Sequence, residues 1–108
     1  MKKESLRRLI SVKFETREAE KYTIVSLETG GVIEPSILKE LKPPKVNAKK
    51  GIILTGRGPI WLYGFLVHFY HPTAWVATYD PRLGGAVVVE SHVPGVEPGD
   101  VIPIKEVG

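Results

Sequence analysis

The sequence contains no cysteine and only one methionine in 108 residues. Without cysteine the chain has no disulfide framework, no thiolate zinc site and no cysteine nucleophile. It also lacks any apolar run close to the roughly 20 residues that a membrane span requires. The basic stretch at residues 1–8 is followed by charged positions at Lys13, Glu15 and Arg17, which argues against a secretory signal peptide. These absences predict a soluble, cytoplasmic protein with no membrane partner.

The composition is that of one ordinary globular domain. Hydrophobic residues make up 43% of the chain and charged residues 25%, and the 11 glycines and 9 prolines predict frequent sharp turns. The chain length fits a single domain over residues 1–108. Residues 1–50 carry 12 Lys/Arg against 7 Asp/Glu, whereas residues 51–108 carry 3 against 5. The basic first half is explained either by a solvated surface that keeps the protein soluble or by a surface that binds a polyanion.

Hydrophobic periodicity predicts a chain rich in strands. Alternating residues at 10–16 and 22–28 predict an antiparallel hairpin that stops at Gly30-Gly31. Four further strands are predicted at 51–55, 74–79, 86–90 and 100–104, and two helices at 35–41 and 59–70. The order contains strand–helix–strand units, which are typical of α/β folds with parallel strands. Ligands bind such sheets at the carboxyl ends of the strands, where Arg57 and Asp80 are expected.

The segment Thr55–Gly58 is the first candidate binding element. Glycines before a helix let the backbone approach a ligand, and the Arg57 guanidinium suits a phosphate. The lysine and Ser/Thr of a Walker loop do not follow, so this is not a nucleotide-binding loop of that type. A tight turn with Pro59 at the start of a helix explains the same residues without a ligand.

The predicted helix at 59–70 is apolar on two opposite faces. Such a helix is buried on two sides, and in a chain this short one side is expected to be a subunit contact. Its remaining face carries Gly64, His68 and His71. Two histidines on one face can hold a metal or exchange protons, although core or helix-end histidines are the commoner explanation.

Two further candidate groups follow the predicted strands of the second half. Asp80-Pro81-Arg82 has two explanations. It is either a simple turn, which Asp-Pro often opens, or a phosphate site, in which the Asp80 carboxylate holds a cation and the Arg82 guanidinium neutralises charge that develops on the phosphate. Ser91-His92 adds a hydroxyl and another imidazole. Oxygen and imidazole ligands suit manganese or magnesium better than a metal that prefers thiolates.

Taken together, these motifs resemble those of a known family. Four segments carry the similarity: Thr55–Trp61, His68–His71, Tyr79–Gly84 and Val87–His92. In this order and spacing they resemble the small stand-alone CRISPR-associated ring nucleases of Csx type. That family is a compact relative of the CRISPR-associated Rossmann-fold sensors. The expected fold is therefore a compact α/β domain, a Rossmann-like mixed β-sheet with an N-terminal β-hairpin and two helices.

The resemblance also implies an activity. Members of the ring-nuclease family form homodimers. Two dimers enclose one molecule of cyclic tetra-adenylate, the second messenger made by type III CRISPR complexes, and cleave it with help from manganese. It implies catalytic roles for His71, Asp80, Arg82 and His92, with His71, Asp80 and His92 as metal-linked positions. The ligand-contacting segment is then Thr55, Gly56, Arg57 and Gly58. Mn²⁺ is the expected cofactor, with Mg²⁺ as the second choice.

Other functions remain open on the sequence. The chain could hold a cyclic or short oligoadenylate RNA without cutting it, which would need only Arg57 and backbone amides. A manganese-dependent RNA deadenylase activity has also been ascribed to the family. A general exonuclease for single-stranded RNA would need exposed aromatic side chains on which the bases stack. Here the aromatic residues are concentrated in the predicted helix and strands, which disfavours this function. DNA is not an expected ligand.

Overall fold

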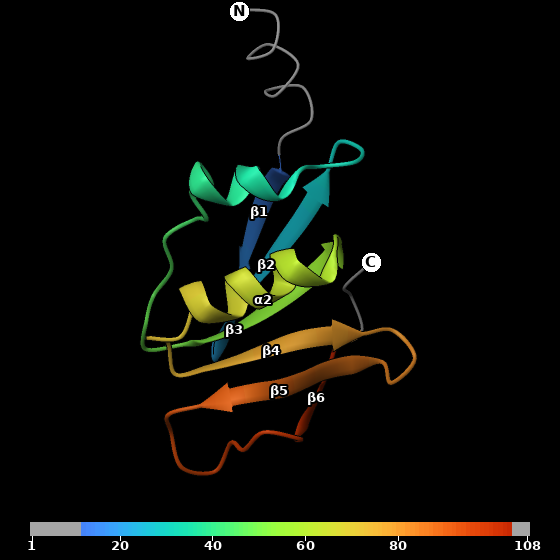
Figure 1. The fold of residues 1–108 in the computed structure, drawn as a ribbon. Coiled ribbons are helices and arrows are strands. Elements are labelled where there is room, and N and C mark those ends of the chain that lie inside the picture. Colours follow the sequence, from blue (N-terminus) through green and yellow to red (C-terminus); the bar gives the residue numbers. More distant parts are fainter. Residues whose placement is uncertain (1–11, 105–108) are drawn as a thin grey trace, which may run out of the picture.

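The computed structural model describes residues 12–104, and this part of the chain forms a sheet with a helix packed on one face (Figure 1). The strands are β1 (Val12–Glu18), β2 (Tyr22–Thr29), β3 (Gly51–Arg57), β4 (Trp75–Asp80), β5 (Gly85–Ser91) and β6 (Val101–Pro103). A 3₁₀ turn, η1 (Pro35–Lys39), precedes β3, and the helix α2 (Ile60–Phe69) follows it. Within residues 12–104, no helix is long and apolar enough to cross a membrane.

The six strands of the described part lie in sequence order, β1-β2-β3-β4-β5-β6. β1 and β2 form the antiparallel hairpin expected from the sequence. β2, β3 and β4 are parallel to one another, and β5 and β6 continue the sheet antiparallel. The two parallel crossovers run through η1 and α2 and lie on the same face of the sheet (Figure 1).

The main core lies between that face and α2. Leu62 and Leu66 of the helix are fully buried against sheet residues such as Val25, Ile52 and Leu54. The continuous apolar run Ile52–Leu54 is buried on both faces of β3, as the sequence predicted for a central strand. The opposite face holds a second cluster, with buried members from β2, β3, β4 and β5, and beside it an open hollow lined mainly by residues of β1, β2 and β3.

The predicted Rossmann-like α/β fold with two helices is wrong. The structure is a small β-rich fold: one six-stranded sheet, one α-helix and one 3₁₀ turn in the described residues. A doubly wound fold covers both faces of a parallel sheet and reverses its strand order at the ligand site. Here both crossovers lie on one face and the order never reverses, because consecutive strands always add to the same edge. The sequence pattern of alternating elements does not distinguish these arrangements.

Local boundaries also differ from the prediction. The expected helix at 35–41 is only a 3₁₀ turn, since Lys42-Pro43-Pro44 leaves too few residues for two α-helical turns. β3 does not end at Thr55 but continues through Gly56 to Arg57. At Gly56 the backbone φ is +122°, and a Cβ there would lie 2.0 Å from the carbonyl oxygen of Leu27. Glycine therefore keeps β3 paired with β2 at this position.

Candidate functional site

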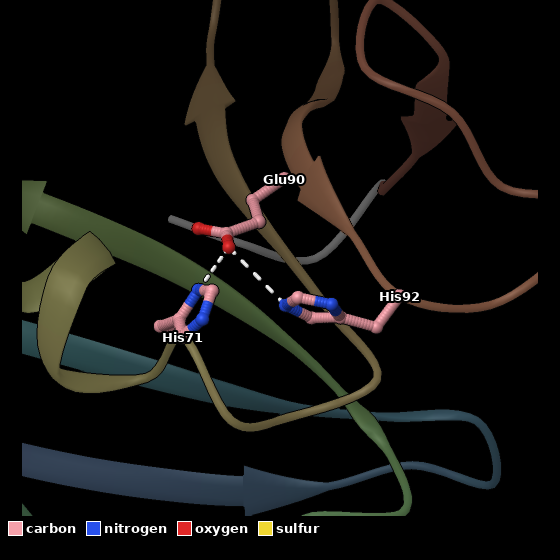
Figure 2. Close-up of side chains that lie close together, drawn as sticks. All are labelled: His71, Glu90 and His92. Carbon is pink, nitrogen blue, oxygen red and sulfur yellow. Dashed lines mark hydrogen bonds and ion pairs between the residues drawn. The ribbon is translucent and has the colours of Figure 1, made fainter.

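Three polar side chains meet where α2 and β5 end (Figure 2). One carboxylate oxygen of Glu90, Oε2, contacts His71 Nδ1 and lies 3.2 Å from His92 Nε2. The two imidazole rings stand edge to face with their centroids 4.6 Å apart. The three ligand atoms all lie within 4.8 Å of one another. We call these residues the His–Glu–His cluster.

A β-bulge aims Glu90 at this cluster. Ala77 of β4 pairs with Val88, but the next β4 residue toward the amino end, Val76, pairs with Glu90, so Val89 is the extra residue. Strand side chains alternate between faces, and an inserted residue reverses the alternation beyond it. Val76 belongs to the core under α2, so Glu90 opposite it faces the helix side, where His71 lies. Without the bulge, Glu90 would share the opposite face with Val88.

The end of α2 fixes the position of His71. The backbone N–H of His71 donates to the His68 carbonyl (3.1 Å), and the Thr73 hydroxyl donates to the Tyr70 carbonyl (2.7 Å). The Tyr70 ring is buried, and its hydroxyl donates to the Pro44 carbonyl (2.7 Å). Burial raises the pKa of the Tyr70 phenol, which keeps this donor protonated. His71 is thus presented from a turn that is anchored on both sides.

The donor set of the cluster fits a first-row divalent metal ion. It offers two imidazole nitrogens and one carboxylate oxygen, the types of ligand that bind manganese, iron or zinc. The side chains of His71, Glu90 and His92 are 52%, 26% and 46% exposed, so an ion and a substrate can reach them from solvent. Imidazole nitrogens and a carboxylate oxygen are also groups that can take up or release a proton in catalysis.

Asp80 and Arg82 lie away from this cluster. Asp80 ends β4, whereas His71 and His92 flank the start of β4. From Trp75 to Asp80 the strand rises through five residue steps, about 17 Å. The Arg82 side chain donates to Asp80 Oδ2 (3.1 Å) and its backbone N–H to Asp80 Oδ1 (2.9 Å). The hydrogen bond from the Arg82 side chain is the main reason that the pKa of the Asp80 carboxyl lies below its ordinary value, and the bond from the Arg82 backbone N–H adds to it. Asp80 is therefore ionised. Within one chain, the predicted set of His71, Asp80 and His92 therefore does not converge.

The segment Thr55–Gly58 lies at the same end of the sheet as Asp80. β3 and β4 are parallel, so their carboxyl ends meet at one edge of the sheet. Thr55, Gly56 and Arg57 line an open hollow of about 1280 Å³ on the helix-free face. The hollow is also lined by polar side chains of the hairpin and by one β4 ring: Lys13, Glu15, Arg17, Ser26, Glu28 and Tyr79. Arg57 is exposed, and within residues 12–104 its side chain has no ion-pair partner.

The comparison with protein families decides the identity of the chain. Residues 26–103 match the family described as "CRISPR-associated protein (Cas_csx3)", which is most of the chain. The chain belongs to the Cas_csx3 family of CRISPR-associated proteins. It is also 52% identical over 84 residues to an uncharacterized protein of Aquifex aeolicus (strain VF5), a match that covers 74% of this chain and 76% of the relative.

The part of the chain that matches the Cas_csx3 family includes every candidate site residue from Thr55 to His92. It also includes Glu90, which is not among the site residues predicted from the sequence. A signal for it was present: Glu90 and His92 are two residues apart, and residues at that spacing in a strand point to the same face. What the sequence did not reveal is the bulge that turns this face toward His71.

Proposed function

We propose that this member of the Cas_csx3 family is a metal-dependent phosphodiesterase that opens cyclic tetra-adenylate and so ends type III CRISPR signalling. The observation that carries the proposal is the His–Glu–His cluster, an exposed group of two imidazoles and a carboxylate in a CRISPR-associated protein. Cyclic tetra-adenylate is proposed as the substrate because the surrounding motifs resemble those of ring nucleases. The bound metal, manganese in this proposal, would stabilise negative charge on the scissile phosphate.

The chemistry assigned to the chain's own residues is proton transfer and positioning. A ribose 2′-hydroxyl of the ring attacks the neighbouring phosphorus; the new P–O2′ bond forms as the P–O5′ bond breaks, which leaves a 2′,3′-cyclic phosphate and a 5′-hydroxyl. In this step we assign the metal to Glu90 and His92, which would leave the His71 imidazole free to take the proton from the 2′-hydroxyl or to supply one to the leaving oxygen. Glu90 contacts both imidazoles and so orients them.

Asp80 and Arg82 enter this proposal from a second chain. About 17 Å along β4 is too far for His71 and Asp80 of one chain to act on one phosphodiester. Ring nucleases of the family that the sequence resembles hold the ring between two dimers. We therefore propose that the His–Glu–His cluster of one chain faces Arg57, Asp80 and Arg82 of another. Arg82 would then neutralise charge that develops on the phosphate, and Arg57 would hold a neighbouring one.

Mixing two inactive variants tests both the reaction and the shared site. His71→Ala and Asp80→Asn should each lower the rate of ring opening by about a hundredfold or more, with most of the binding affinity kept. Combined in equal amounts, the two variants should regain activity, because some sites then pair an intact His71 with an intact Asp80. Arg57→Ala is the matched binding variant: it should weaken affinity by about 1.5–3 kcal/mol, roughly ten- to a hundredfold.

Two results would contradict the proposal separately. Ring opening at the parent rate by both folded variants removes His71 and Asp80 from the reaction. Loss of activity in each variant without recovery in the mixture places the whole reaction within one chain. Both measurements use labelled cyclic tetra-adenylate with and without Mn²⁺, followed by chromatography of the products.

The second candidate function is binding of cyclic or short oligoadenylate RNA without cleavage. The open hollow favours it, because the polar floor around Thr55 and the unpaired Arg57 suit a nucleotide without any catalytic group. Tight binding with no turnover under Mn²⁺ or Mg²⁺ supports this alternative. Shortening of a labelled oligoadenylate tail under Mn²⁺, with the ring left intact, supports a deadenylase.

A further inference from the structure

A basic connector leads from η1 to β3. It comprises residues 42–50, which include four lysines and no acidic residue. Lys42, Lys45 and Lys49 are exposed, and within residues 12–104 none of their side chains has an ion-pair partner. Lys50 differs, because its ammonium group donates to Glu18 Oε1 (2.9 Å) and to the Ala19 carbonyl (2.7 Å). Three lysines are therefore available to an external anion.

The backbone of the basic connector is held in place. Pro43 is buried, and the carbonyl of Pro44 accepts the hydrogen bond from the Tyr70 hydroxyl. Val46 packs against the core under α2. Asn47 Oδ1 accepts from the Lys49 N–H (2.9 Å), and the Asn47 carbonyl accepts from the Lys50 N–H (3.1 Å). A fixed backbone lowers the entropy cost of presenting these lysines to a partner.

The basic connector lies at the same end of the sheet as the His–Glu–His cluster. The Ala74 N–H donates to the Lys50 carbonyl (3.2 Å), and the His92 N–H donates to the Ala74 carbonyl (2.9 Å). Two strand spacings, about 10 Å, therefore separate the backbones of Lys50 and His92. Figure 1 shows the connector passing the end of α2 from which His71 follows.

We infer that Lys42, Lys45 and Lys49 bind the phosphate backbone of a linear single-stranded nucleic acid whose end reaches the His–Glu–His cluster. This inference rests on the proposed phosphodiesterase function, and it adds a surface on which a strand longer than a small ring is held. Exposed lysines without ion-pair partners attract phosphates by releasing counterions. A membrane surface is disfavoured, because the apolar Val46 packs inward and leaves the connector no large exposed anchor.

The test measures binding of a fluorescent twelve-nucleotide oligoadenylate in EDTA, so that no cleavage takes place. The triple variant Lys42→Gln, Lys45→Gln, Lys49→Gln should bind about tenfold more weakly or worse at low salt. The slope of log affinity against log salt should fall in magnitude by about 2, which corresponds to three lost phosphate contacts on a single strand. The matched control changes the same lysines to arginine, which keeps the charge and should keep the affinity.

The outcomes separate this inference from the proposed function. Unchanged affinity of the Gln variant overturns the inference, even if the parent protein opens cyclic tetra-adenylate. Equal competition by polyglutamate also overturns it, since the surface would then bind any polyanion. Weaker binding by the Gln variant alone supports it even if no ring opening is found. Comparing RNA with DNA of the same sequence then shows whether phosphates suffice or the 2′-hydroxyl is read as well.

Discussion

Glu90 is the residue that joins the two candidate histidines. A single carboxylate oxygen contacts His71 and lies 3.2 Å from His92, although the two histidines are 21 positions apart in the chain. Either imidazole alone would be an ordinary exposed histidine. With Glu90 between them, the three side chains form a donor set of the kind that divalent metals select. We therefore expect metal affinity to depend on Glu90 at least as strongly as on either histidine.

Glu90→Gln tests that dependence. The amide keeps the shape of the side chain but removes the negative charge, so Mn²⁺ affinity should fall by at least about tenfold. Electron paramagnetic resonance of titrated Mn²⁺ measures the free ion directly. Glu97→Gln, which removes an exposed carboxylate from the segment between β5 and β6, serves as the control and should leave the affinity unchanged. Equal affinities for the parent and the Glu90 variant would show that the ion does not bind at the cluster.

At the scale of elements, periodicity predicted most of the strands and the helix α2 but not their arrangement, and it failed locally where a single residue changes the geometry. The hairpin, the central apolar strand and the helix near 59–70 all follow from apolar spacing, and the structure confirms them. The bulge at Val89 did not follow, because an uninterrupted run of valines at 87–89 carries no alternation to read. That missed bulge is also why Glu90 was overlooked. The continuation of β3 through Gly56 was missed because glycine is usually a turn residue.

Two glycines give opposite predictions for the same substitution. Gly56→Ala should lower the free energy of unfolding by about 2 kcal/mol or more, because φ is +122° and the new Cβ would lie 2.0 Å from a backbone oxygen. Gly64→Ala should raise it by about 1 kcal/mol, because alanine favours a helix more and nothing lies within 4 Å of its Cβ. Urea unfolding followed by circular dichroism measures both. A neutral Gly56→Ala would mean that β2 and β3 separate at this end without cost.

For the whole molecule, the strand order separates the predicted site residues into two groups. β4 joins them: the His–Glu–His cluster lies at its start, and Asp80 and Arg82 lie at and just beyond its end. The sequence identified candidates in both groups but could not show this separation, since distance along a chain does not reveal which end of a sheet a loop occupies. The residues at the two ends of β4 can act in one reaction only if the start of β4 in one chain meets the end of β4 in another. The proposed reaction therefore depends on the oligomeric state.

We expect the protein to be a homodimer, because α2 is apolar on more sides than the sheet covers. Leu62, Leu66 and Tyr70 are buried, yet Phe69 remains 42% exposed beside Phe65, whose ring stacks with it at 6.5 Å. Phe69→Asp places a charge on this surface and should raise the dimer dissociation constant by at least about tenfold, since burying an aromatic side chain contributes about 1.5–3 kcal/mol. Multi-angle light scattering over a dilution series measures the shift. Val32→Asp, at a residue 89% exposed between β2 and η1, is the control and should leave the dimer intact. A parent chain that is monomeric at micromolar concentration would refute the dimer, and with it the proposed sharing of the site between chains.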